Sequence, residues 1–161
     1  TPSRRTRLVV RSTDVLGLFE DVTVGFLGFA ETYLGAFGEG KGQNMWVTVP
    51  FVASSEAEGT QDFVSKIRAA AGEDVPISHY VMTHYNSLIA VKAALEASGE
   101  IDSEALIDGL EGLEITTPTG PATIGATDHH VTMNMYLAKT EGLGLDVIEE
   151  LGSLAPEALC N

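Results

Sequence analysis

The sequence has little cysteine and little positive charge, and it has no long apolar run. Cys160 alone cannot form an internal disulfide or a cysteine-rich metal site. The 161 residues include 9 lysines and arginines against 23 aspartates and glutamates, which gives a formal net charge of −14. A chain of this charge repels nucleic acid and anionic lipid, which argues against a binder of phosphate backbones. The apolar segment 22–30 is too short for a membrane helix, which needs about 20 residues.

The few basic residues are unevenly distributed. Residues 12–161 contain five basic and 23 acidic residues, a net charge of −18, because four of the nine basic residues lie at the start of the chain. With 44% hydrophobic residues, the chain is large enough for one domain with a sizeable core. It begins with Thr1 and no signal-peptide pattern, so we expect a fragment or a processed chain, with any targeting signal upstream. The four basic residues at the start are Arg4, Arg5, Arg7 and Arg11.

The order of hydrophobic patterns predicts an α/β fold, in which helices alternate with buried and half-buried strands. Residues 8–10 are predicted as a short strand, and the seven glycines of residues 14–42 disfavour a long helix there. The predicted strands are residues 45–52, 113–116, 122–124, 131–138 and 145–151, and the predicted helices are residues 55–72, 78–98 and 102–112, followed by an irregular tail over 152–161.

Local signals set the helix ends and the buried faces. Ser55 and Glu58 have the spacing of a capping box, and Asp102 or Ser103 is expected to cap the third helix. Gly120 is expected in a tight turn between antiparallel strands, with positive φ. The residues expected on buried helix faces are Val81, Tyr85, Leu88, Val91 and Leu95, widened by Ile89 and Ala94, in the second helix, and Leu106, Ile107 and Leu110 in the third.

The four histidines do not have the spacing of a metal site. His129 and His130 are adjacent, so on a strand they point to opposite faces, and Asp128 with His130 supplies only two ligands. His79 and His84 are five residues apart and face different sides of a helix. We therefore expect no metal and no cofactor, and a melting temperature that a chelator leaves unchanged.

An enzyme is not supported either. The sequence has no Gly-x-Ser-x-Gly motif, and the glycine-rich residues 38–42 lack the spacing of a phosphate-binding loop. No serine–histidine–acid set has a recognisable context, and the acids Glu149 and Glu150 are expected to be solvated.

The start of the second predicted helix allows two interpretations. Residues 79–86 combine two tyrosines with polar side chains, before a helix that becomes apolar. Free N–H groups at a helix start suit a carboxylate or carbonyl of a ligand, so this segment could line a binding site. Alternatively, these residues begin an amphipathic helix whose aromatic rings pack under a neighbouring loop.

Several short segments in the later three quarters of the chain match one family pattern. They are residues 43–51, 62–64, 72–74, 85–99, 102–113, 117–121 and 128–130. Their order and spacing over about 120 residues resemble the C-terminal part of type I periplasmic binding proteins. Within this family, the segments most resemble the ABC-transporter receptors for branched-chain amino acids, amides and urea. The first forty residues do not match the pattern.

The resemblance implies portions of a two-lobed α/β fold, with parallel sheets covered by helices, crossing strands and a ligand cleft between the lobes. Residues 1–44 would belong to the second lobe, residues 45–138 mainly to the first, and residues 139–161 to the second lobe and a tail. The family places an aromatic residue before the helix that Tyr85 opens, which aligns with Tyr80. The ligand-contacting residues implied by this alignment are Tyr80, Thr83, His84 and Tyr85.

The expected function is therefore non-catalytic capture of a small polar solute for an ABC permease, in the periplasm or at the cell surface. A short amide, urea or a branched-chain amino acid would be the ligand, and the absence of lysine and arginine from residues 79–86 favours a neutral amide or urea. The alternatives are a cytosolic amide sensor that controls gene expression and an amide hydrolase. Exposed parts of incomplete cores would favour a homo-oligomer.

Overall fold

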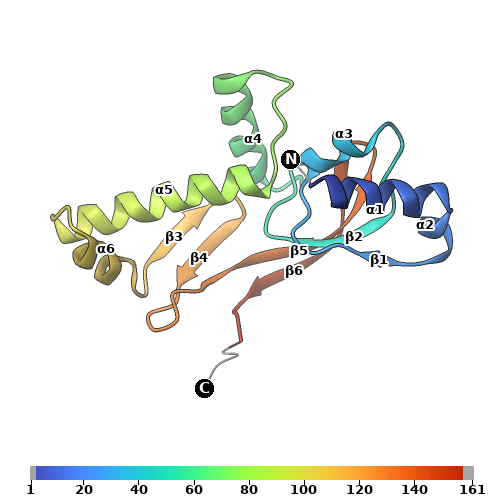
Figure 1. The fold of residues 1–161 in the computed structure, drawn as a ribbon. Helices are drawn as coiled ribbons and strands as arrows, with labels where there is room; N and C mark the ends of the chain where they lie inside the picture. Colours follow the sequence, from blue (N-terminus) through green and yellow to red (C-terminus); the bar gives the residue numbers. More distant parts are fainter. Residues whose placement is uncertain (1–2, 158–161) are drawn as a thin grey trace.

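One long strand, β5 (Val131–Glu141), connects the two halves of the molecule (Figure 1). The computed structural model describes residues 3–157, so Cys160 and the end of the predicted tail lie outside the described residues. At its start β5 pairs with β4 through Val131 and Thr132, and further along it pairs with β2 through residues 136–139. Strand β6 (Gly144–Leu154) returns antiparallel along the other edge of β5. The six-stranded sheet therefore has the order β1-β2-β5-β4-β3, with β6 also paired to β5.

The remaining elements fall on either side of this strand (Figure 1). The first body contains α1 (Arg4–Val15), α2 (Leu18–Asp21), β1 (Val24–Gly25), η1 (Glu31–Tyr33), α3 (Leu34–Phe37) and β2 (Met45–Val49), with the later part of β5 and β6. The second body contains α4 (Glu58–Ala71), α5 (His79–Ser98), α6 (Ser103–Leu110), β3 (Glu114–Thr117) and β4 (Gly120–Ile124).

Each body has its own hydrophobic core. The core of the first body packs α1, η1 and α3 onto strands β2, β5 and β6, and the core of the second body lies between α4, the loop before α5 and the first turn of α5. Burying such side chains contributes about 1.5–3 kcal/mol each, so each core supports its own body. The first core comprises Val10, Phe29, Leu34, Phe37, Met45, Val47, Val49, Val52, Tyr136, Ala138 and Leu145, and the second Phe51, Phe63, Val64, Ile77 and Met82.

The elements with the strongest periodicity are confirmed. The strand predicted over residues 45–52 is β2, the helix predicted over 78–98 is α5, and the last two strands are β5 and β6. Asp102 caps α6, because its carboxylate accepts hydrogen bonds from the backbone N–H groups of Glu104 and Ala105 at 3.0 Å.

The short strand predicted over residues 8–10 is wrong, because these residues lie within α1. Ser3 caps this helix by accepting a hydrogen bond from the N–H of Thr6 at 3.1 Å. Only Val10 of α1 is buried, so three consecutive apolar residues do not here mark a buried strand.

The capping box predicted at Ser55 is also wrong. Helix α4 begins at Glu58, and its N-cap residue Ala57 makes no side-chain capping bond. The backbone oxygen of Ser55 instead accepts a hydrogen bond from Nε2 of Gln61 at 2.6 Å. Ser55 therefore stabilises the loop before α4 rather than the helix end.

The buried face of α5 agrees with the prediction at Ala94 but not at its centre. Ala94 is buried as expected, whereas Leu88 is 71% exposed, and Met82, Asn86 and Ala90 are buried outside the predicted face. Small residues allow α6 to approach α5 closely, since a Cβ at Gly109 would lie 3.0 Å from the backbone oxygen of Ala94.

In α6 the predicted burial is wrong for Ile107, which is 43% exposed, while Leu106 and Leu110 are half-buried rather than buried. Leu88 of α5 and Ile107 of α6 are therefore exposed apolar side chains, and the predicted homo-oligomer stays a prediction.

The predicted turn at Gly120 is confirmed. Strands β3 and β4 are antiparallel, Thr117 pairs with Gly120, and Gly120 has φ of 109°. The hydroxyl of Thr117 accepts from the N–H of Thr119 at 3.2 Å and donates to the backbone oxygen of Gly120 at 2.7 Å. A Cβ at position 120 would lie 3.0 Å from Nδ2 of Asn134, so glycine fits both the conformation and the space.

We expect Gly120→Val to lower the free energy of unfolding by about 1–3 kcal/mol, because valine is strained at positive φ. Chemical denaturation measures the change. Gly25→Val in β1 is the matched control, since a Cβ at this position would have no atom within 4 Å and the φ of Gly25 is not positive. Equal effects of the two substitutions would contradict this account of the turn.

Candidate binding site

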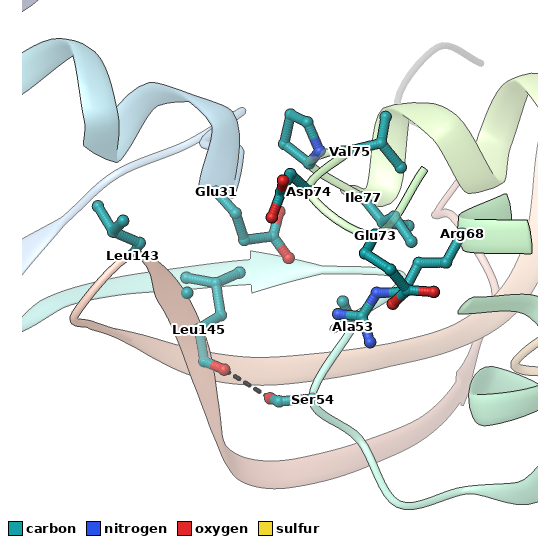
Figure 2. Close-up of a pocket in the computed structure, with 12 residues that line it drawn as sticks. Glu31, Ala53, Ser54, Arg68, Glu73, Asp74, Val75, Ile77, Leu143 and Leu145 are labelled. Atoms are coloured by element: carbon teal, nitrogen blue, oxygen red, sulfur yellow. Dashed lines mark hydrogen bonds between the residues drawn. The ribbon is translucent and has the colours of Figure 1, made fainter. Parts of the chain in front are cut away.

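A cavity of about 370 Å³ lies where the two bodies meet (Figure 2). The first body contributes η1 and the turn between β5 and β6, and the second body contributes the end of α4 and the loop that leads to α5. The hydroxyl of Ser54 donates to the backbone oxygen of Leu145 at 2.7 Å and ties the segment after β2 to that turn. The lining residues are Glu31, Ala53, Ser54, Arg68, residues 73–77 and residues 143–145.

Glu31 is the unusual residue of this cavity. Its position is fixed because Phe29 before it and Leu34 after it are buried in the first core, and the adjacent Ala30 is buried as well. The side chain is only 8% exposed, and neither carboxylate oxygen has a hydrogen-bond partner among the described residues. Burial raises the pKa of Glu31 to about 7, although the nearby backbone N–H groups of Glu31 and Ala53 act in the opposite direction. A buried acceptor without a donor costs free energy, so this carboxyl group lowers the stability of the folded state.

The charged groups around the cavity are mostly acidic. Glu73 and Asp74 lie on the loop across from Glu31, and Arg68 at the end of α4 is the single basic residue in the lining (Figure 2). Arg68 forms no ion pair within the part of the chain that the structure describes. The cavity is therefore suited to a group that donates N–H bonds or carries positive charge, rather than to a second carboxylate.

Two tyrosines link the bodies close in sequence to residues of this cavity, although neither lines it. The hydroxyl of Tyr80, at the start of α5, donates to the backbone oxygen of Gly28 at 3.1 Å and lies 3.4 Å from the hydroxyl of Tyr33. Because the proton of Tyr80 is used toward Gly28, Tyr33 donates to Tyr80, and this bond raises the pKa of Tyr33. Tyr33 lies two residues after Glu31 in η1, so the tyrosine contact and the buried carboxylate share one short segment.

His79 is packed beside Tyr80. Its ring centroid lies 4.1 Å from that of Tyr80, its side chain is buried, and Nδ1 has no partner among the described residues. Burial lowers the pKa of His79, so the ring stays neutral at pH 7.

The four residues that the family resemblance implies do not converge on one point. Thr83 and His84 bond back to the backbone oxygen of Tyr80, at 3.1 and 2.6 Å, and the ring of Tyr85 packs 5.1 Å from that of Phe63 on α4. Of the four, Tyr80 is the one whose side chain hydrogen-bonds to the first body within the described residues. Their roles in ligand binding stay predictions.

Sequence reasoning missed Glu31. The sequence feature that could have identified it is a single acidic residue between the apolar segments 22–30 and 33–37. Burial of the apolar residues on either side also buries the carboxylate. The cavity itself could not be anticipated, because its walls come from four separated parts of the chain.

The histidines near the β4–β5 connection pair with acids. Nε2 of His129 lies 3.2 Å from Glu111, and Nδ1 of His130 lies 3.8 Å from Asp128. Residues 3–157 contain no cluster of three or more potential metal ligands, and none of their helices is long and apolar enough to cross a membrane. Unchanged melting in the presence of a chelator remains a prediction.

The sequence profile described as periplasmic binding protein matches residues 7–144. The chain belongs to the periplasmic binding protein family. This match includes most of the first forty residues, for which the sequence motifs gave no resemblance.

Named relatives agree with this family. The Leu/Ile/Val-binding protein homolog 6 of Brucella abortus is 27% identical over 108 residues, which is 66% of this chain and 27% of the relative. Among solved structures, an ABC transporter substrate-binding protein from Sphaerobacter thermophilus has a TM-score of 0.78 and 19% identity, over 93% of this chain and 42% of that protein. A solute-binding protein from R. palustris, in complex with 4-hydroxybenzoate, has a TM-score of 0.76 and 21% identity, over 93% and 42%.

The fold is thus α/β and represents part of a periplasmic binding protein of type I. The chain spans about a quarter of the Brucella relative and less than half of the solved neighbours. These relatives are substrate-binding proteins, which agrees at the level of the family with the expectation that the chain is not an enzyme. The division of residues 1–44, 45–138 and 139–161 between two lobes stays a prediction.

The raised pKa of Glu31 predicts a pH dependence of stability. The unfolded carboxyl group has a pKa of 4.5 and the folded one about 7, so between these values the folded state binds more protons. The free energy of unfolding therefore falls as the pH rises through this range, by about 3 kcal/mol from this group. Glu31→Gln removes the effect, and we expect the variant to be more stable than the wild type at pH 8 and similar to it below pH 4.5.

Thermal unfolding of both proteins at several pH values, without added ligand or denaturant, measures this difference. Glu149→Gln, at an exposed position of β6, is the control and should leave the pH profile unchanged. A stability difference between Glu31→Gln and the wild type that does not vary with pH would contradict the raised pKa.

Proposed function

We propose that this chain forms part of a receptor that binds a small polar solute between its two bodies and delivers it to an ABC permease without chemical change. Membership of the family and the names of its relatives support this function. The observation that carries it is Glu31, because a buried carboxylate without a hydrogen-bond donor beside a cavity is explained by a donor that arrives with the ligand. A location in the periplasm or at the cell surface is part of the same proposal.

The ligand that fits this cavity presents N–H groups. An amino acid would place its ammonium group against Glu31, and a short amide or urea would donate its neutral N–H groups to the same oxygens. Both fit a carboxyl group with a pKa of about 7, which can be ionised by a bound cation or stay protonated beside a neutral ligand. An aromatic acid that placed its carboxylate here would face Glu31, Glu73 and Asp74, so we do not assign the ligand of the R. palustris neighbour to this chain.

Isothermal titration with leucine, urea, acetamide and 4-hydroxybenzoate tests the ligand class, and product analysis tests turnover. We expect binding of a ligand that carries amino or amide groups, without hydrolysis. In Glu31→Gln an ammonium ligand should lose about 10- to 100-fold in affinity, because a charged hydrogen bond is lost, whereas urea should change little. Binding of 4-hydroxybenzoate alone, or hydrolysis of acetamide, would overturn the proposal.

Tyr80 is proposed to supply an apolar wall at the same junction. Its ring is 40% exposed while its hydroxyl is held by Gly28 and Tyr33. Truncating a packed aromatic residue at a binding site costs about 2 kcal/mol, so Tyr80→Ala should weaken ligand binding about thirty-fold. Tyr80→Phe keeps the ring and should weaken it only a few-fold.

The melting temperature of the ligand-free protein separates binding from folding. We expect Tyr80→Ala to change it little, since the side chain is not part of either core. Unchanged affinity, or a large loss of stability without ligand, would show that Tyr80 is a structural residue.

A further inference from the structure

Helix α1 carries a row of arginines along one face. Arg4, Arg7 and Arg11 follow a spacing of three and four residues, so they lie on the same side of the helix. None of these arginines forms an ion pair within residues 3–157, and the one acidic residue of α1, Asp14, is paired with Lys41. Together with Leu8 and Ala36 they line a shallow hollow of about 350 Å³ between α1 and α3.

Exposed apolar side chains accompany the arginines. Leu8 lies within the arginine row and is 66% exposed, and Val15 continues the same face at 77%. Val9 and Leu16 on the adjoining face are 63% and 72% exposed. Large aliphatic side chains are not needed for solubility or for holding a soluble anion, so the combination resembles the surface of an interfacial helix.

The charge of α1 opposes that of the rest of the chain. Four of the nine basic residues lie in α1, whereas residues 12–161 have a net charge of −18. Charges more than about 8–10 Å from a surface are screened at physiological salt, so the acidic remainder does not prevent local attraction of α1. It disfavours every other orientation of the molecule against a negative surface.

We propose that α1 is a docking surface for an anionic phospholipid membrane. The guanidinium groups of Arg4, Arg7 and Arg11 pair with lipid phosphates, and Leu8 and Val15 enter the boundary between headgroups and acyl chains. The contact is weak and peripheral, since it uses a few arginines and two aliphatic side chains. The hollow beside α1 and the cavity at Glu31 share no lining residue, so this contact is independent of the proposed ligand.

Flotation of the full chain with phospholipid vesicles tests this surface. At low salt the protein should bind vesicles that contain phosphatidylglycerol and not vesicles of phosphatidylcholine alone, and high salt should release it. Arg7→Gln with Arg11→Gln should reduce partitioning about thirty-fold. The matched control is Lys66→Gln with Lys92→Gln, which removes two exposed positive charges from α4 and α5 and should change partitioning little.

Leu8→Ser separates a membrane from a soluble anion. It should reduce partitioning about five-fold, because a partly inserted leucine is lost, while leaving charge unchanged. Equal binding to neutral vesicles, equal losses in the two charge variants, or no effect of Leu8→Ser would overturn the proposal. Binding of polyglutamate or salt-dependent self-association in place of vesicle binding would overturn it as well, in favour of an acidic protein partner or a second copy.

Discussion

The pairing of β5 with strands of both bodies is the constraint on which the rest of the structure depends. Its first residues belong to the ladder with β4, and its later residues belong to the ladders with β2 and β6. The same strand therefore joins both bodies, and its ladder with β6 shifts register between Met135 and Tyr136, just before the part paired with β2, and again between Leu137 and Ala138. That arrangement brings η1 of the first body to the loop before α5 and encloses the cavity between them (Figure 2).

The buried carboxylate of Glu31 lowers the stability of the fold at the position of the candidate binding site. Its apolar neighbours Phe29 and Leu34 must be buried to complete the first core, and the carboxylate is carried inward with them. Neither oxygen accepts a hydrogen bond of ordinary geometry from the described residues, and the nearby backbone N–H groups of Glu31 and Ala53 offset only part of the effect of burial. Its ionised form therefore weakens the fold at neutral pH. Strained or unsatisfied groups of this kind are found at functional sites, where a bound ligand can supply the missing hydrogen-bond donor. The tyrosine contact two residues away gives the same junction a hydrogen bond between the bodies.

Local patterns predicted the elements that local physics determines. Alternation of side chains identified β5, and a long helical repeat closed by Gly99 identified α5, since both depend on neighbouring residues. The buried face of α5 could not be predicted, because Met82 and Ala90 are selected by what packs against them rather than by hydrophobicity. The segment 8–10 was wrongly predicted as a strand because three apolar residues are too few to show a period. The cap at Ser3 and the twelve residues of α1 favour a helix. Glu31 and its cavity depend on contacts between distant segments, which no local pattern contains.

The most direct measurement of the central claim is the titration of the Glu31 carboxyl group by NMR, with isotope-labelled glutamate and Glu31→Gln for assignment. If Glu31 is a buried carboxylate reserved for a ligand, its pKa should be about 7 in the free protein. Saturation with a bound amino acid should lower that pKa, since an ammonium group stabilises the ionised form. A pKa near the ordinary value of 4.5 in the free protein, unchanged by ligand, would contradict the account.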